Sequence, residues 1–328
     1  MSAVLDCATP LALAFAVALI LAWVLTRRRV RGLALDQPNE RSLHRDPVPR
    51  TGGLAIMGGV FAGWLLLHPP FHLAVTLALL ALASLSFIDD VRSLPVAVRL
   101  FAHLAAGGIV MTVFPGLPLL LWLAGVLGIA WMINLYNFMD GSDGLAGGMA
   151  FFGFGYYGVA AALQGDVGYA CAAWAVSAAA LGFLVFNFNP ARIFMGDAGS
   201  VPLGFLAAAF GVQGWWRELW PLWFPLLVFS PFIVDATVTL GRRLWQRERV
   251  WEAHRDHYYQ RLVQLGLGHR RTALVEYAVM ILCGLAGLAG LHAGADAQSI
   301  LLGSVAMAYM FAMLAIDATW RTYVRPGS

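Results

Sequence analysis

The sequence has little charge. Of its 328 residues only 12% are charged and 60% are hydrophobic, whereas a soluble domain carries roughly 25% charged residues because its surface faces water. This composition excludes a soluble globular enzyme, a disordered chain and a nucleic-acid-binding protein. The surplus apolar residues must face lipid, so the chain is predicted to be a polytopic integral membrane protein.

Lysine is absent, and all 21 basic residues are arginine. Mechanisms that need a lysine nucleophile, a Schiff base or a P-loop lysine are therefore excluded. Cysteine is also scarce: Cys7, Cys171 and Cys283 are scattered through apolar sequence without CxxC spacing. They are predicted to be buried small side chains, with neither a disulfide framework nor a zinc site. The first apolar run ends in an arginine cluster and has no basic residue before it, which favours a retained span over a cleaved signal.

Long apolar runs dominate what is present. A helix needs about 20 apolar residues to cross the hydrocarbon, and runs this continuous are not alternating barrel strands. The sequence therefore predicts an all-α fold with about eleven transmembrane helices. Their expected ranges are 9–26, 52–68, 71–88, 97–114, 118–134, 148–163, 167–186, 200–216, 219–240, 272–292 and 298–316.

The arginines predict the orientation of these spans. If the N-terminus lies outside and the C-terminus in the cytoplasm, the inner segments contain twenty of the 21 arginines, and only Arg217 lies outside. Positive residues collect on the cytoplasmic side of membrane proteins. We therefore expect one transmembrane domain over residues 1–328, without a soluble domain. Its cytoplasmic loops are predicted near 27–51, 89–99, 135–147, 187–199 and 241–271.

Five carboxylates gather at the predicted inner ends of three spans. For a single aspartate the simpler interpretation is a solvated helix end. That interpretation weakens when five of them lie in Gly- and Asn-rich sequence on three separate inner loops. They are Asp89, Asp90, Asp140, Asp143 and Asp197.

The first two motifs supply acidic and amide oxygens. The adjacent Asp89 and Asp90 disfavour joint ionisation unless a cation or phosphate chemistry accommodates them. A solvated helix C-terminus is the alternative, although negative charge there opposes the helix dipole. Asn137, Asp140 and Asp143 lie in a glycine-rich loop that can surround a hard cation or a sugar, the alternative being a flexible turn.

The other two motifs supply positive and aromatic groups. Arg192 offers a fork for phosphate oxygens, and Asp197 a ligand for Mg²⁺ at the start of a helix that favours anions. Phe194 is either a membrane anchor or a surface on which a flat ring stacks. His254 and His257 are three residues apart and share a helix face, whereas the arginines before them also suit contact with anionic lipid. Further residues suited to binding phosphate, on the first inner loop, are Arg41, His44, Arg45 and Arg50.

The remaining histidines are interpreted as interface or packing residues. They are His68, His72, His103, His269 and His292. Together the four motifs predict a carboxylate cluster suited to Mg²⁺, with Mn²⁺ as the alternative ion. Such a cluster beside arginines suits a pyrophosphate substrate from the cytosol and an acceptor dissolved in the bilayer.

These motifs resemble those of the polyprenyl-phosphate N-acetylhexosamine-1-phosphate transferases. The matching blocks follow one another in the expected order between about residues 36 and 260. They are Asp36–His44 with Pro49–Gly53, Phe87–Asp90, Asn134–Gly148, Pro190–Ser200 and His254–His257.

The resemblance implies Mg²⁺-dependent transfer of a sugar 1-phosphate from a UDP-linked amino sugar to undecaprenyl phosphate, with release of UMP. It implies a multi-pass enzyme of the bacterial inner membrane with a cytoplasmic active site, and leaves a homodimer open. Asp89 would be the base, with Asp90 beside it at the metal, and Asp197 would bind the metal. Asn137, Asp140 and Asp143 would line the nucleotide and metal region, and Phe194 would stack on uracil. His254, Arg255 and His257 would cover the phosphates and the sugar.

Two departures bear on the branch of the family. The peptidoglycan translocase has a lysine soon after the Asp-Asp pair and a run of three histidines, whereas this chain has Arg92-Ser93 and His-Arg-Asp-His. The pattern is more similar to the branch that starts O-antigen or other surface polysaccharide on UDP-GlcNAc or a 6-deoxy relative. The rival class is a transporter or flippase of lipid-linked sugars, whose ionisable residues would lie near the bilayer midplane. A CDP-alcohol phosphotransferase lacks support because its spaced aspartate signature is absent.

Overall fold

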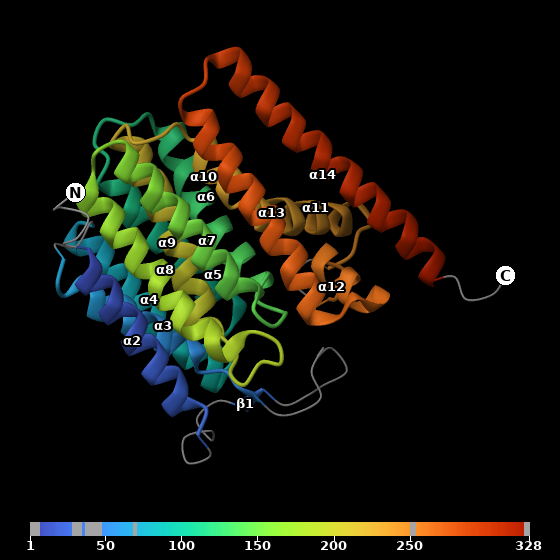
Figure 1. The fold of residues 1–328 in the computed structure, drawn as a ribbon, viewed down its shortest axis with the longest axis horizontal. Helices are drawn as coiled ribbons and strands as arrows, with labels where there is room; N and C mark the ends of the chain where they lie inside the picture. The colour runs from blue at the N-terminus through green and yellow to red at the C-terminus, as the bar shows by residue number, and fades with distance from the viewer. Residues whose placement is uncertain (1–6, 28–34, 37–47, 68–70, 250–253, 325–328) are drawn as a thin grey trace.

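The computed structural model describes residues 7–27, 35–36, 48–67, 71–249 and 254–324, and within these it is almost entirely helical (Figure 1). A two-residue antiparallel ladder joins β1 (Leu35–Asp36) and β2 (Val48–Pro49). The helices are α2 (Ala8–Leu25), α3 (Gly52–Trp64), α4 (Leu73–Arg92), α5 (Val96–Thr112), α6 (Leu119–Phe138), α7 (Leu145–Leu163), α8 (Val167–Asn187), α9 (Asp197–Trp216), α10 (Trp223–Val228), α11 (Ser230–Trp245), α12 (Tyr258–Leu262), the π-helical turn η1 (Val263–Leu267), α13 (Gly268–Leu291) and α14 (Ala295–Val324).

The all-α membrane fold expected from the sequence is confirmed. Seven described helices are long and apolar enough to cross a bilayer, and α3 and α5 are shorter apolar helices. Each of the eleven expected segments coincides with a helix, except that 219–240 is divided near Phe229 into α10 and α11. Figure 1 shows α11 running across the direction of α13 and α14.

Small residues allow the helices at the N-terminal side of the bundle to approach closely. A Cβ on Gly59 of α3 would lie 2.5 Å from the carbonyl oxygen of Ala14 in α2. A Cβ on Gly182 of α8 would lie 2.6 Å from the carbonyl oxygen of Phe15. Small residues at such contacts are how helices pack in lipid, where no hydrophobic force drives them together. This packing fixes α2, α3 and α8 as one tight group.

The C-terminal helix α14 lies at the outside of the bundle, on the side opposite α2 (Figure 1). None of its most apolar 18-residue window is buried by the protein. Exposed apolar side chains along it include Ile300, Phe311 and Leu314. A helix this apolar and this uncovered must be covered by lipid.

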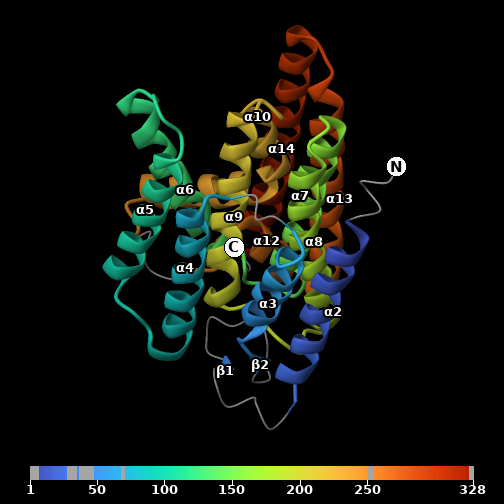
Figure 2. The same cartoon turned by 90° about the vertical axis from the view of Figure 1, so that its left-hand side faces the viewer.

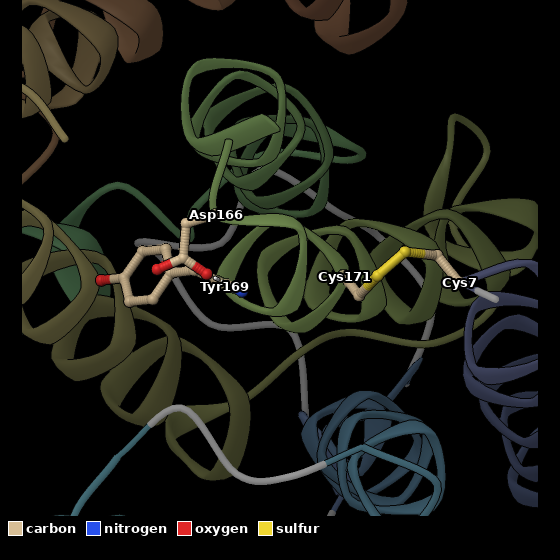
Figure 3. The surroundings of a disulfide bond; sticks show 4 residues. All are labelled: Cys7, Asp166, Tyr169 and Cys171. Atoms are coloured by element: carbon tan, nitrogen blue, oxygen red, sulfur yellow. Dashed lines mark hydrogen bonds between the residues drawn. A yellow bond between two sulfur atoms is a disulfide. The ribbon is translucent and has the colours of Figure 1, made fainter. Parts of the chain in front are cut away.

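A disulfide joins Cys7, at the start of α2, to Cys171 near the start of α8 (Figure 3). The expectation that all three cysteines are unpaired was therefore wrong for two of them, while Cys283 is free and buried. The pairing escapes sequence inspection because the two cysteines are 164 residues apart and only the packing of α2 against α8 brings them together. Beside it, Asp166 accepts a hydrogen bond from the backbone N–H of Tyr169 and pairs with Arg217.

Thiol labelling tests this disulfide. Unreduced, denatured protein is expected to label at one cysteine, and reduced protein at three. Cys7→Ser should lower the free energy of unfolding by about 2–4 kcal/mol, because the link closes a long loop in the unfolded chain. Cys283→Ser is the control, since it should keep the disulfide and lose the single label. Three labelled thiols in unreduced protein would contradict the structure.

The loops with the candidate residues lie together at the end of the bundle away from the disulfide. The backbone N–H of Gly144 donates to Asn187 Oδ1 at the end of α8, and Gly52 donates to the carbonyl of Phe194. The two ends of α8, with Cys171 near one and Asn187 at the other, are about 30 Å apart by helix rise. We call the end with Asn187 the site end. The β1–β2 ladder lies at this end, beneath α3 (Figure 2).

Candidate active site

Asp90 holds the start of α9. Its two carboxylate oxygens accept hydrogen bonds from the backbone N–H groups of Asp197, at 3.0 Å, and Ala198, at 2.9 Å. A carboxylate is stabilised there because the N–H groups and the dipole of a helix N-terminus attract negative charge. Gly196 has φ +69°, and a Cβ there would lie 2.8 Å from Asp90 Oδ2 and 2.5 Å from the carbonyl oxygen of Arg50. The close contact therefore requires glycine, and it ties α4 to α9.

Asp89 and Asp197 approach each other across Arg99. Nη1 of Arg99 lies 3.2 Å from Asp89 Oδ2 and 3.9 Å from Asp197 Oδ2. Asp89 is only 8% exposed. Sequence reasoning placed Arg99 in the 89–99 loop without giving it a role, although its position ten residues after Asp89 was the available signal. One guanidinium thus lies between carboxylates from two different helices.

The donor chemistry of this pair suits a hard divalent cation. Among the described residues no group of three or more His, Cys, Asp or Glu side chains has the spacing of a protein-only metal site. Mg²⁺ does not need one, since it commonly takes one or two carboxylates and fills the rest of its octahedron with water and substrate phosphates. Asp197 offers oxygens for this, and Asp89 offers Oδ2, which bonds to the Arg99 side chain, while its Oδ1 accepts from the backbone N–H of Leu94. Both Asp90 oxygens are bonded to backbone N–H groups.

A cavity of about 670 Å³ opens beside these groups, between α4, α5, α6, α9 and α11. Part of its wall is polar, and Asn137 in that part accepts a hydrogen bond from Ser200 Oγ at 2.6 Å. Its rim includes the exposed apolar side chains of Val96, Leu100 and Leu244. The cavity therefore joins a charged interior to an apolar opening. Its polar lining residues are Ser86, Asp89, Arg99, His103, Asn134, Asn137, Asp197 and Thr237.

His103, interpreted from the sequence as a packing residue, lines this cavity. It is one helical turn beyond Arg99 on α5, so the two side chains share a face. It is 5% exposed, and its Nδ1 has no hydrogen-bond partner within the described structure. A buried imidazole nitrogen without a partner is unusual, and the His103 side chain lines the same cavity as Asp89.

Asp143 braces two loops at the site end. Its Oδ2 accepts hydrogen bonds from Asn189 Nδ2 at 2.8 Å and from the backbone N–H of Ala191 at 3.1 Å. Asn187 connects the same loops through Gly144 and Ile193. The loop that follows α6 is thereby fixed against the loop that precedes α9. Asp140 lies on the first of these loops and is half-buried.

The segment before α9 is fixed by the backbone of the segment before α3. Phe194 N–H donates to the carbonyl oxygen of Pro49 at 2.8 Å, and Gly52 N–H donates to the carbonyl oxygen of Phe194 at 2.9 Å. The positive charge of Arg50, which precedes α3, favours the charged forms of the Asp90 and Asp197 carboxyl groups.

The guanidinium of Arg192 is exposed and lies 4.7 Å from the ring centre of Phe186. Of the first inner loop, Arg41, His44 and Arg45 lie outside the described residues.

The histidine motif is held by Asp235, which sequence reasoning missed. His257 Nδ1 lies 3.1 Å from Asp235 Oδ1, and the backbone N–H groups of Tyr258 and Tyr259 each donate to this carboxylate at 3.0 Å. Asp235 is buried in α11, inside a segment interpreted as an apolar span. An isolated carboxylate inside an apolar run was the signal, because a buried charge requires partners.

The two histidines stack on each other. Their ring centres are 4.9 Å apart, and the rings are inclined by 28°. Burial, together with the neighbouring His257 and Arg243, lowers the pKa of His254 to about 4. His254 is therefore uncharged at neutral pH and is available as a neutral hydrogen-bonding group. Arg255 lies beside it on the same loop, half-buried.

The histidine motif adjoins the loop after α6. Tyr259 Oη donates to the carbonyl oxygen of Phe138 at 3.3 Å, and a Cβ on Gly141 would lie 2.1 Å from that hydroxyl. His269, expected to be a packing residue, is 2.9 Å from Ser142 Oγ. The structure thus brings the expected residues that it describes to one end of the bundle, in three connected groups around Asp89, Asp143 and His257.

Fold and site together define an integral membrane transferase. The family model described as glycosyl transferase family 4 matches residues 72–214, which run from α4 to α9.

Three relatives are similar over most of their length. A probable undecaprenyl-phosphate N-acetylglucosaminyl 1-phosphate transferase of Bacillus subtilis (strain 168) is 32% identical over 282 residues, covering 80% of this chain and 78% of the relative. An undecaprenyl-phosphate alpha-N-acetylglucosaminyl 1-phosphate transferase of Yersinia pestis is 25% identical, covering 88% and 85%. A phospho-N-acetylmuramoyl-pentapeptide-transferase of Moorella thermoacetica is 29% identical, covering 85% and 96%. The chain belongs to the polyprenyl-phosphate N-acetylglucosamine-1-phosphate transferase family.

Proposed function

We propose that the protein transfers an N-acetylhexosamine 1-phosphate from a UDP-linked sugar to undecaprenyl phosphate and releases UMP. The observation that carries this proposal is the meeting of Asp89 and Asp197 at Arg99, inside a cavity whose rim is apolar. A nucleotide sugar needs the charged side of such a cavity, and a lipid phosphate needs the apolar side.

The apolar side continues past the cavity. A second cavity of about 450 Å³, almost entirely apolar, lies along α6, α9 and α10, and Trp131 lines both cavities. The prenyl chain next to the acceptor phosphate would lie there, with its phosphate at Asp89. The names of the relatives from Bacillus subtilis and Yersinia pestis include undecaprenyl phosphate, which supports this acceptor.

The chain's own residues would position and deprotonate the reactants of an in-line displacement. Asp89 takes the proton from the acceptor phosphate, and the freed oxygen attacks the sugar-bound phosphorus of the donor. The bond from that phosphorus to the bridging oxygen breaks, and UMP leaves with the bridging oxygen. Arg50 and Arg99 orient the phosphates, and Asp197 holds the cation. When bound, Mg²⁺ supplies the positive charge that neutralises the pyrophosphate.

His254, Arg255 and His257 would cover the donor from the other side, with Asn137 and Asp140 lining the nucleotide region and Phe194 offering a ring for uracil. His254, being neutral at pH 7, would contact the sugar rather than compete for phosphate. The proposed cell location is the bacterial inner membrane with the site end in the cytoplasm, where UDP-sugars are available. The arginine distribution supports this orientation.

We further propose a donor without a peptide, such as UDP-GlcNAc or a 6-deoxy relative, and a role in starting O-antigen or another surface polysaccharide. The absence of a lysine after Asp90 and of a third adjacent histidine supports this branch over the peptidoglycan translocase. A flippase is disfavoured because the candidate groups collect at one end of the bundle rather than at its middle.

A donor screen tests the proposal. Purified protein with polyprenyl phosphate and Mg²⁺ is expected to release UMP from UDP-GlcNAc or a 6-deoxy relative and to form the polyprenyl-diphosphate sugar. EDTA should abolish the release, and added Mg²⁺ should restore it. Mass spectrometry of the lipid product checks the transfer. UMP release from UDP-MurNAc-pentapeptide alone would assign the peptidoglycan branch, and no UMP from any UDP-amino sugar would refute the enzyme proposal.

A further inference from the structure

A third cavity, which is polar, lies at the site end between α11, α12 and α14. None of the residues assigned to the transfer reaction lines it. It has a volume of about 450 Å³. Four arginines but only three carboxylates line it, together with Trp320. The arginines are Arg242, Arg243, Arg261 and Arg321, and the carboxylates are Glu248, Asp256 and Asp317.

Ion pairs already balance part of the positive charge of these arginines. Asp317 of α14 accepts two hydrogen bonds from Arg242, at 3.0 and 2.9 Å, and one from Arg261 at 2.8 Å. Arg243 pairs with Glu248 and Asp256. These contacts hold α14 against α11 and α12.

Two arginine N–H groups at this cavity have no hydrogen-bond acceptor among the described residues. The Nε–H groups of Arg243 and Arg261 are buried and have no hydrogen-bond partner in the described structure, and Arg261 is only 7% exposed. Arg321 is exposed and has no ion pair within the described residues. A buried guanidinium N–H without an acceptor is costly. A net positive cavity with an exposed arginine that has no ion pair in the described part of the chain suits an anion with several oxygens, and arginine forks match phosphate well.

The position of the cavity identifies the source of that phosphate. The cavity lies at the C-terminal end of α14, the helix that lipid must cover along its whole apolar length. On the adjacent end of α11, Leu244 is 68% exposed and Trp245 is 90% exposed. Exposed tryptophan and leucine at the end of an apolar helix are typical of the membrane interface. The cavity is therefore at the depth of lipid head groups.

We propose that this cavity binds the phosphate of an anionic phospholipid head group. Arg321 donates to the phosphate oxygens, the other three arginines of the cavity add positive charge around them, and the acyl chains lie along α14. Arg261 belongs to α12, the short helix that follows His257 directly. A bound head group therefore lies beside the helix that directly follows the histidine motif.

Lipid retention measured by native mass spectrometry tests the site. The full chain is released from nanodiscs of phosphatidylglycerol or of phosphatidylcholine, and the bound lipids are counted. Wild-type protein is expected to retain phosphatidylglycerol in preference. Arg321→Gln should weaken that retention about fivefold, since one arginine near a lipid surface contributes about 1 kcal/mol, whereas Arg321→Lys should keep most of it. The matched control is Arg271→Gln, an exposed arginine at the start of α13 outside the cavity.

Hydrogen exchange gives a second readout. Phosphatidylglycerol should slow amide exchange over 258–262 in wild-type protein and in Arg271→Gln, but not in Arg321→Gln. Equal retention of the two lipids, or equal retention by Arg321→Gln and Arg271→Gln, would overturn the proposal. Displacement of the lipid by millimolar inorganic phosphate or glycerol 3-phosphate would also overturn it, by showing a site for soluble phosphate.

Discussion

Replacing Asp89 with asparagine is expected to reduce the rate of UMP release about a thousandfold, the range by which a positioned general base accelerates a reaction. Asparagine keeps the size of the side chain and its hydrogen bond to the backbone N–H of Leu94, but it cannot take the proton from the acceptor phosphate. Asp197→Asn should have an effect of similar size for a different reason, because it removes a charged oxygen that the cation needs. Initial rates at saturating donor and acceptor measure both.

Two controls separate chemistry from folding. Asp296→Asn removes an exposed carboxylate from the first turn of α14, and it should leave the rate unchanged. Thermal unfolding of Asp89→Asn and Asp197→Asn should match wild type within a few degrees. Raising the Mg²⁺ concentration should recover part of the Asp197→Asn activity and none of the Asp89→Asn activity. A wild-type rate of UMP release by Asp89→Asn would show that Asp89 is not the general base.

The hydropathy of the sequence predicts the helices closely. The expected span 9–26 is α2 (Ala8–Leu25), and 167–186 is α8 (Val167–Asn187), because a bilayer fixes both the length and the composition of a crossing helix. The division of 219–240 at Phe229 was not predicted. Ser230-Pro231 directly follows Phe229 and marks the start of α11, because proline suits the first turn of a helix, but hydropathy alone does not register it.

The sequence identified the residues of the candidate site better than it identified the role of each residue. The motifs identified Asp89, Asp90 and Asp197 as a group, and the structure brings them together between α4 and α9. The division of labour within the adjacent pair depends on where α9 begins, because that decides which carboxylate meets backbone N–H groups. Sequence patterns cannot show this. Asp143 likewise looks like a ligand in its motif, yet the structure uses its Oδ2 to fasten a loop.

Residues that act from outside the motifs were the ones missed. Arg99 and His103 lie on a helix whose apolar pattern explains it fully as a span, and only the fold turns them toward Asp89. Cys7 and Cys171 were missed for the same reason, since their partner is set by tertiary packing. Asp235 is the largest omission, because it organises the whole histidine motif.

Asp235→Ala is expected to lower the transfer rate about a hundredfold, the cost of a displacement near 1 Å in a catalytic constellation. The change leaves the buried N–H groups of Tyr258 and Tyr259 without an acceptor, and it frees the His257 ring. The histidine motif would then leave its place over the donor. Hydrogen exchange should rise over 254–262 and stay unchanged in α7 and α8, and the KM for the donor should rise while that for the acceptor stays constant.

Thr239→Val is the graded control for this position. Thr239 donates a single hydrogen bond to Asp235 Oδ1 at 3.1 Å, so its loss should leave the carboxylate in place and reduce the rate only a fewfold. Asp235→Asn should fall between the two variants, because one amide oxygen still accepts while the amide N–H₂ faces a backbone donor. An Asp235→Ala protein with wild-type kinetics would show that the histidine motif needs no anchor in α11. A uniform rise in exchange throughout the bundle would show instead that Asp235 supports the fold as a whole, and would refute a specific positioning role.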